Sequence, residues 1–327
     1  MLDVLQPIFD SGFHPSSYGY RPGRSCQDAV AKATLFMRRH RLRSVVDMDL
    51  SKCFDRLDHD LIIESLRRRI RDRSILALVR KFLESGVMIE GREERTEIGS
   101  PQGGVISPLI SNVYLDAFDQ EMKRRGHRIV RYADDILILC RSEKAAEKAK
   151  QVATTILEED LRLKVNGKKT HLVHASKGVK FLGVKIGLVW SQIQSQKITA
   201  TKAKVKALTR RNSPVNLEEL IKELNPLLRG FGNYYQMANC KGVFKELSLW
   251  IRRRLRAKQL ALWKRPSRLH RRLRELGYQG EFAKIRMRGW RNSKSPLANY
   301  SMPNEWFREL GLYQLEGLNT GVLPEIK

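Results

Sequence analysis

Three aspartates are the residues whose types and spacing point most directly to chemistry. Asp49 ends a short β-prone run, and Asp134 and Asp135 stand side by side between two apolar β-prone runs. Adjacent carboxylates in apolar surroundings are costly, because like charges repel and burial opposes ionisation. A divalent cation offsets that cost, and oxygen donors without Cys or His favour Mg²⁺. Carboxylates on neighbouring strands suit two ions about 3.5–4 Å apart that transfer a phosphoryl group; the alternative for Asp134–Asp135 is a solvated turn.

Short strands and amphipathic helices must position these carboxylates. Alternation predicts strands over 44–50 and 179–186, and a hairpin over 128–140 with the two adjacent aspartates at its tip. Helical spacing of apolar residues predicts helices over 26–40, 61–69, 74–85, 109–122 and 143–161. Beyond about residue 200 the pattern is helical throughout, over 201–211, 217–229, 242–264 and 266–276. We therefore expect an α+β domain over residues 1–190 and a mostly helical domain over 191–327.

Residues 98–111 form a segment without any charged side chain, rich in Gly, Ser and Pro, that leads into an apolar helix. A glycine-rich loop of this kind lets a ligand approach the backbone closely. Taken alone, the segment is equally compatible with an ordinary loop.

Positive charge is concentrated in the second part of the chain. The 327 residues carry 62 Lys+Arg and 35 Asp+Glu, a formal net charge of +27. Residues 1–190 contribute +9 and residues 191–327 contribute +18. A basic helical region after a mixed-charge domain favours a polyanionic partner, nucleic acid before a membrane surface. A generally basic surface that keeps the chain soluble by self-repulsion is the alternative.

Other classes of protein are not supported by the composition. No apolar stretch approaches 18 residues, so no membrane span is expected. Cys26, Cys53, Cys140 and Cys240 form no C-x-x-C pair and have no His at metal-ligand spacing. A zinc site or a disulfide framework is therefore not expected, and a reducing cytoplasm fits best.

The carboxylates belong to an ordered series of motifs. Tyr132-Ala133-Asp134-Asp135 resembles the Y-x-D-D box of reverse transcriptases, in a form that resembles those encoded by bacterial group II introns. The other matching segments, in family order, are Gly19–Ser25, Asp49–Asp55, Ser100–Pro108, Lys168–Thr170 and Phe181–Gly183. The resemblance covers about residues 4–186. It implies a right-hand polymerase palm, an antiparallel sheet with helices, and partial fingers.

The activity that this resemblance implies is RNA-directed DNA synthesis, in which dNMP from a dNTP is added to the 3′-OH of a DNA primer on an RNA template. Asp49, Asp134 and Asp135 would bind two Mg²⁺ ions, and the backbone at Leu50 would hold the triphosphate. Lys169 would donate a proton to pyrophosphate, although a solvated lysine is an open alternative.

The resemblance also implies contacts to the substrates. Phe54 stands where an aromatic ring blocks a ribose 2′-hydroxyl, with a core aromatic as the alternative. Gln102 and Gly103 lie in the loop that contacts the nucleotide and the template. Arg21 and Arg24 are predicted either to contact the template or to stabilise the fingers.

A second region of resemblance follows. Pro226–Tyr235 and the helix that ends in Trp250–Arg256 resemble the maturase-specific region of group II intron proteins. This implies a basic, all-α thumb/maturase domain that binds structured intron RNA. Arg252, Arg253, Arg254 and Arg256 are the candidate RNA contacts, because arginine pairs with phosphates and stacks on bases. A solvated basic face is the alternative.

Three functions stay open at this point. The first is a reverse transcriptase that also assists splicing, and the second is a non-catalytic or weakly catalytic maturase that uses the palm as a scaffold. A reverse transcriptase of another bacterial lineage is the third, and the match over 226–256 argues against it. Because the chain starts close to the fingers–palm block, we expect an N-terminal fingers segment to be missing, and we expect no endonuclease module.

Overall fold

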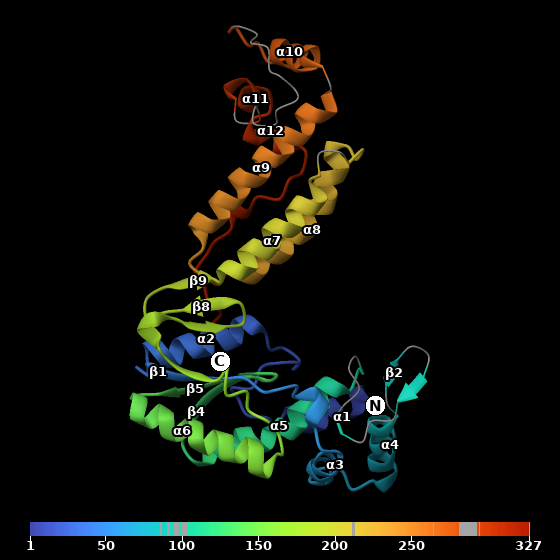
Figure 1. Ribbon diagram of the computed structural model, residues 1–327, viewed down its shortest axis with the longest axis vertical. Helices are drawn as coiled ribbons and strands as arrows, with labels where there is room; N and C mark the ends of the chain where they lie inside the picture. The colour runs from blue at the N-terminus through green and yellow to red at the C-terminus, as the bar shows by residue number, and fades with distance from the viewer. Residues whose placement is uncertain are drawn as a thin grey trace. The chain divides into compact units, whose positions relative to one another are not determined.

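A computed structural model describes residues 1–326 except 86, 90–91, 95–97, 100–103, 211–212, 264, 281–292 and 294. The chain divides into two compact units, one formed by residues 1–190 with 323–327 and the other by residues 191–322 (Figure 1). Among the described residues, no helix is long and apolar enough to cross a membrane. The four cysteines are unpaired.

The first unit is built on a four-stranded antiparallel sheet. Its strand order is β4 (Arg128–Tyr132), β5 (Asp135–Cys140), β1 (Ser44–Met48) and β6 (His171–His174). β1 therefore lies between two strands that follow it by about 90 and 125 residues in the chain, and the hairpin β4–β5 forms one side of the sheet. The strand expected over 44–50 and the hairpin expected over 128–140 are confirmed.

Helices cover both faces of this sheet, as Figure 1 shows. Val46, Met48, Ile136 and Ile138 belong to a buried cluster with α5 (Ser107–Arg124) and α6 (Glu143–Thr155). The alternate residues face α2 (Cys26–Arg38), whose apolar side chains are also buried. Each large apolar side chain that is fully buried contributes roughly 1.5–3 kcal/mol. Because the period of a strand is two, Asp49 and Asp135 fall on the α2 face, beyond the buried residues.

Further elements of the first unit come from residues 2–94. They are α1 (Leu2–Asp10), the short 3₁₀ turn Phe54–Arg56, α3 (His59–Arg67), α4 (Arg73–Glu84) and the hairpin β2 (Val87–Ile89)–β3 (Arg92–Glu94). Asp58 and Asp72 cap α3 and α4 by accepting backbone N–H bonds in the first turn.

Two predictions of secondary structure are wrong in detail. The single strand expected over 179–186 is a hairpin of β7 (Val179–Phe181) and β8 (Val184–Ile186). Leu182 and Gly183 have φ of 46° and 79°, and two successive left-handed residues turn the chain back on itself. The helix expected over 143–161 ends at Thr155 and continues as a π-helical turn, Ile156–Asp160.

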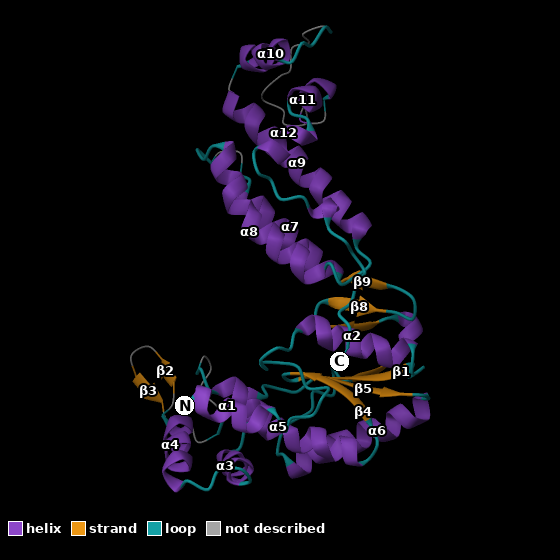
Figure 2. Ribbon diagram, turned by 180° about the vertical axis from the view of Figure 1, so that it is seen from behind, coloured by secondary structure: helices purple, strands orange, loops and turns teal. Residues whose placement is uncertain are grey.

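The second unit is almost entirely helical (Figure 2). After the short β9 (Ser191–Ile193) come α7 (Ser195–Leu208), α8 (Leu217–Tyr235), α9 (Lys241–Trp263), α10 (Pro266–Glu275), α11 (Pro296–Ser301), α12 (Asn304–Glu309) and a 3₁₀ turn, Leu315–Gly317. The segment after α12 packs back on α8 and α9: Asn225 Nδ2 donates to the Gly311 carbonyl at 2.8 Å, and Arg252 pairs with Glu316.

Candidate active site

The three aspartates meet because of strand register. β4 and β5 pair Tyr132 with Asp135, which leaves Ala133 and Asp134 as a two-residue turn. β1 and β5 pair Met48 with Ile136, so the next position along β1 places Asp49 opposite Asp135. Asp49 and Asp135, which are 86 residues apart in the chain, are thus neighbours at one end of the sheet.

Negative charge is concentrated at this end of the sheet. Desolvation by the neighbouring strands, followed by repulsion from Asp134, Asp47 and Asp49, raises the pKa of Asp135 to about 6. Burial and the charge of Asp49 also raise the pKa of Asp47, while His171 opposes the shift. A cation bound among these carboxylates would relieve this repulsion.

Lys169 and Asn166 contact Asp49 from the turn before β6. The Lys169 ammonium Nζ lies 3.5 Å from Asp49 Oδ2, and Asn166 Nδ2 donates to the same oxygen at 3.0 Å. Lys169 remains 68% exposed. The register of β6 on β1, which pairs Asp47 with His171, accounts for its place opposite Asp49. Asn166 was not among the residues singled out in the sequence.

The donor set of this site fits a divalent cation with a preference for oxygen. In the part of the chain that the structure describes, no three His, Cys, Asp or Glu side chains already converge as a metal site. The side chains at the hairpin tip are nevertheless carboxylates, and burial together with their mutual repulsion raises the pKa of Asp135. Carboxylate oxygens without thiolate or imidazole match Mg²⁺. Asp49, Asp134 and Asp135 are the residues that would hold it.

The residues that follow Asp49 lie close to the carboxylates. Leu50 is buried and forms an isolated antiparallel bridge with Val165. Phe54 is half-buried rather than part of the core, and its ring meets Tyr20 edge-on, with ring centroids 6.5 Å apart. Gln102 and Gly103 lie outside the described residues, so their predicted contacts stay predictions.

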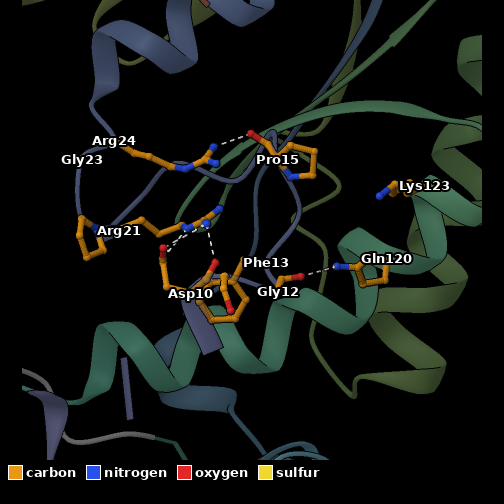
Figure 3. A pocket seen from close by; sticks show the side chains of 11 residues that line it. Asp10, Gly12, Phe13, Pro15, Arg21, Gly23, Arg24, Gln120 and Lys123 are labelled. Carbon is orange, nitrogen blue, oxygen red and sulfur yellow. Dashed lines mark hydrogen bonds and ion pairs between the residues drawn. The ribbon is translucent and has the colours of Figure 1, made fainter. Parts of the chain in front are cut away.

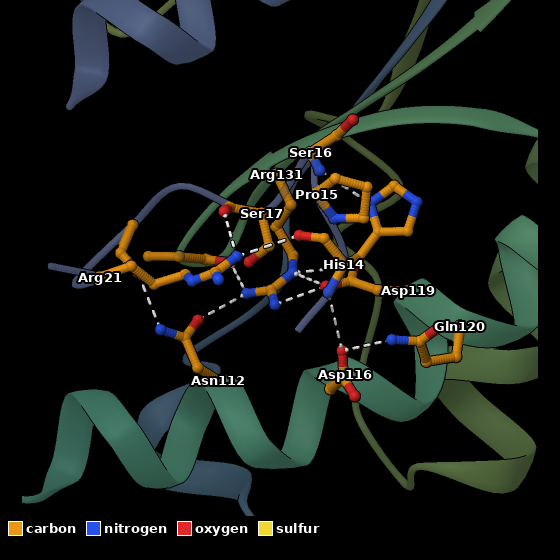
Figure 4. Close-up of polar contacts among 12 residues, drawn as sticks. His14, Pro15, Ser16, Ser17, Arg21, Asn112, Asp116, Asp119, Gln120 and Arg131 are labelled. Carbon is orange, nitrogen blue, oxygen red and sulfur yellow. Dashed lines mark hydrogen bonds and ion pairs between the residues drawn. The ribbon is translucent and has the colours of Figure 1, made fainter. Parts of the chain in front are cut away.

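A buried charge network holds the hairpin tip in place (Figure 4). Arg131 and Asp119 are both 0% exposed and form a two-pronged pair, with Nε–Oδ1 at 2.9 Å and Nη2–Oδ2 at 2.6 Å. Arg131 Nη1 also donates to the Ala133 carbonyl at 3.0 Å and to Asn112 Oδ1 at 2.9 Å. Asn112 in turn donates to the Gly19 carbonyl at 2.8 Å. The turn that carries Asp134 is thereby fixed to α5 and to the segment around Gly19.

The close approach of the Gly19 segment to the hairpin turn requires a glycine at position 19. A Cβ there would lie 2.3 Å from the Ala133 backbone nitrogen, which is too close for any side chain. No role was predicted from the sequence for Arg131, Asn112 or Asp119. The signal was present in Arg131, a charged residue in a strand whose other inward positions are apolar.

For Arg21 and Arg24, two roles were predicted: contact with the template or stabilisation of the fingers. The structure distinguishes the two residues. Arg21 is buried, pairs with Asp10 at 2.7 Å and donates to the carbonyls of His14 and Ser17. It therefore stabilises the fold, and we no longer predict that it contacts the template. Arg24 is half-buried, donates to the Pro15 carbonyl and lies over the Tyr18 ring. Figure 3 shows both arginines on one side of a cavity of about 600 Å³, with Lys123 and Gln120 on the other.

The predicted RNA contacts of the α9 arginines are wrong for two of the four residues. Arg252 is 4% exposed and pairs with Glu316, and Arg256 is 8% exposed and donates to the Met302 carbonyl at 2.9 Å. Burial, followed by repulsion from Arg252, lowers the pKa of Arg256 to about 10. Both side chains are used inside the second unit, so their predicted RNA contacts are not kept.

Arg253 and Arg254 differ from these two. Both are half-buried, and Arg254 is bonded through Nε to Thr209 Oγ1 at 2.6 Å while its guanidinium lies over the Trp250 ring. Contact of these two residues with RNA remains a prediction. Arg253 is the better candidate, because Arg254 is already bonded within the second unit.

Two family profiles match the chain. The family described as reverse transcriptase (RNA-dependent DNA polymerase) matches residues 1–186, and the group II intron maturase-specific domain matches residues 198–277. Among curated proteins, the chain is 31% identical over 258 residues to protein YkfC of Escherichia coli K12, which covers 68% of this chain and 67% of YkfC. It is 26% identical to the group II intron-encoded protein LtrA of Lactococcus lactis subsp. cremoris, over 56% of this chain and 41% of LtrA.

A solved structure of similar fold is telomerase from Candida tropicalis in complex with a fragment of telomeric RNA. It matches with a TM-score of 0.50 and 12% identity, over 98% of this chain and 51% of that protein. At this identity the similarity concerns the fold alone. It agrees with the α+β, right-hand polymerase fold expected from the sequence.

Replacing Arg131 by Met is expected to destabilise the first unit by about 3–5 kcal/mol, because the Asp119 carboxylate is then buried without a partner. Denaturant unfolding of the full chain measures this. Arg124→Met is the matched control, since Arg124 pairs with Glu121 at the exposed surface, where such a pair contributes less than about 1 kcal/mol. Equal losses in the two variants would contradict the role given to the buried pair.

Asp135→Asn is expected to stabilise the metal-free protein at neutral and basic pH. The folded-state pKa of about 6 lies above the ordinary value of 3.8, so ionised Asp135 opposes folding above pH 6 and the effect fades as pH falls toward 4. Allowing for solvent screening, we expect a gain of about 1 kcal/mol at pH 8. Thermal unfolding in chelator from pH 4 to 8 measures it, with the exposed Asp160→Asn as control. A gain that is independent of pH contradicts the prediction.

Proposed function

Because the chain belongs to the reverse transcriptase (RNA-dependent DNA polymerase) family, and within it to the group II intron type with a maturase-specific domain, we propose that it extends a DNA primer on an RNA template. RNA-directed DNA polymerisation is the activity of that family. The chain spans 67% of YkfC and 41% of LtrA, two of the curated relatives that it matches. Its own activity, substrates and partners are therefore stated as proposals.

One observation carries the catalytic proposal: strand register sets Asp49 opposite Asp135 and puts Asp134 in the adjoining turn. In this proposal the three carboxylates hold two Mg²⁺ ions. When bound, such ions lower the pKa of the attacking 3′-hydroxyl and stabilise the charge on the leaving pyrophosphate. The protein's part is positional, since the tip is fixed through Arg131 and Asn112 before any substrate arrives.

The residues near the carboxylates have proposed roles toward the dNTP. The backbone at Leu50 would hold the triphosphate, and the half-buried Phe54 ring would exclude a ribose 2′-hydroxyl. Lys169 is exposed enough to reach a phosphate, and its ammonium next to Asp49 would donate a proton to pyrophosphate. Arg24 would contact the template from the edge of the same segment that packs on the hairpin tip.

The second proposed activity is binding of structured group II intron RNA to assist splicing, through residues 191–327 as the thumb/maturase domain. Arg253 and Arg254 remain proposed contacts. Because Arg252 and Arg256 are buried, we propose that α10 supplies a further basic surface. Helix α10 buries Leu269 and Leu273 and stacks Arg272 over Trp306, which fixes its orientation. Arg265, Arg268 and Arg271 are exposed at helical spacing of three residues. A helix face of arginines fits the phosphates of folded RNA.

The non-catalytic maturase is not favoured. A palm that served only as a scaffold would have no need to gather three acidic side chains at a place where burial, and then their repulsion, raises the pKa of Asp135. The reducing cytoplasm remains a prediction from the four unpaired cysteines.

Asp134→Ala is expected to reduce primer extension on an RNA template by about a hundredfold or more, because it removes a proposed metal ligand. The rate of dNMP incorporation by the full chain in Mg²⁺ measures this. RNA affinity should be unchanged, and Asp160→Asn serves as the control for loss of a carboxylate elsewhere. Equal rates in the parent protein and Asp134→Ala would refute the catalytic proposal.

Arg268→Gln combined with Arg271→Gln is expected to weaken binding of a group II intron transcript and to flatten its salt dependence. Each lost phosphate contact lowers the slope of log affinity against log salt by roughly 0.7–0.9. Filter binding at several salt concentrations measures both. The control is Arg67→Gln with Arg68→Gln, two exposed arginines at the end of α3 with the same change in charge. If both double variants bind alike, the α10 face is not the contact.

A further inference from the structure

The turn that precedes β6 forms a clamp on Asp49 and the two residues after it. The Asn166 backbone N–H donates to the Asp49 carbonyl at 2.8 Å, and Ser51 N–H donates to the Lys164 carbonyl at 2.8 Å. From the other end of the turn, Thr170 Oγ1 accepts the Asp49 N–H at 3.2 Å. The backbone around Asp49 is therefore fixed from two sides by residues more than 100 positions later in the chain.

Asn166 is itself held rigidly by this turn. Its carbonyl accepts N–H bonds from Lys169 at 3.1 Å and Thr170 at 2.8 Å. With its backbone bonded on both sides, the side chain loses little further freedom when Nδ2 donates to Asp49 Oδ2 at 3.0 Å. Asn166 can thus set the orientation of the Asp49 carboxylate at small entropic cost.

Lys169 and Asn166 both contact Asp49 Oδ2, but they differ in charge and therefore in their compatibility with a bound cation. Lys169 carries a positive charge on a flexible, exposed side chain 3.5 Å away, so a divalent cation would repel it. Asn166 is neutral and donates a hydrogen bond that is compatible with a bound cation. Both contacts go to Oδ2, so Oδ1 is the oxygen of Asp49 that would bind a cation.

We propose that Asn166 is a positioning residue that orients the Asp49 carboxylate for a divalent cation. This inference rests on the proposed function, because it assigns Asp49 the role of metal ligand. Hydrogen bonds to a ligating carboxylate fix its orientation and strengthen metal binding, and loss of such a partner weakens metal affinity roughly 10–100-fold. The side-chain amide supplies this bond, while the backbone of the same residue maintains the turn.

The test is direct binding of Mn²⁺, an oxygen-preferring surrogate for Mg²⁺, to the full chain without nucleic acid. Free Mn²⁺ is measured by electron paramagnetic resonance. Asn166→Ala is expected to raise the Mn²⁺ dissociation constant about tenfold. Its melting temperature should stay near that of the parent protein, because the three backbone bonds of residue 166 remain. Lys168→Ala, an exposed neighbour in the same turn, is the matched control and should bind Mn²⁺ like the parent protein.

Primer extension supplies the second readout. Asn166→Ala should need about ten times more Mg²⁺ for half-maximal rate, with the KM for dNTP measured at saturating Mg²⁺ unchanged. If Asn166→Ala binds Mn²⁺ as tightly as the parent protein, or loses only thermal stability, the inference is wrong. If Asp49→Asn leaves Mn²⁺ binding unchanged, Asp49 is not a metal ligand, and the proposed function fails together with the inference.

Discussion

The buried pair between Arg131 and Asp119 is the interaction on which the rest of the first unit depends. Neither side chain reaches solvent, and a charge buried this way is tolerable only with a closely matched partner. The remaining donors of Arg131 reach Ala133 and Asn112, so one guanidinium connects α5, β4 and the hairpin turn. A site that must hold three carboxylates together needs such a rigid support, since their repulsion opposes their assembly.

The three carboxylates of the site repel one another, and they are held together because different parts of the sheet carry them. Asp49 follows the last residue of β1, Asp134 lies in the β4–β5 turn, and Asp135 begins β5. The turn before β6 holds Asp49 in place through its backbone and through Asn166. Burial, and then repulsion from the neighbouring carboxylates, raises the pKa of Asp135. Perturbed groups of this kind gather at functional sites because their charge is used there.

The basic side chains of the second unit divide into buried and exposed ones. Arg252 is buried and pairs with Glu316 in the segment that follows α12. Arg256 donates to the Met302 carbonyl, between α11 and α12, and to Asn304 at the start of α12. These arginines join distant parts of the unit and are removed from solvent. The rest, including the arginines on the exposed face of α10, accounts for a surface that fits a polyanion.

The sequence alone determined the strand at 44–48, the β4–β5 hairpin and the carboxylates at its tip, because alternation and turn chemistry are local properties of neighbouring residues. Only the tertiary structure decided which cations are structural, since burial depends on partners far along the chain. Arg252 meets Glu316 across 64 residues, and Asn166 meets Asp49 across 117. Such contacts leave no periodic trace in the sequence, so an arginine paired in the interior and an arginine exposed at the surface cannot be told apart there.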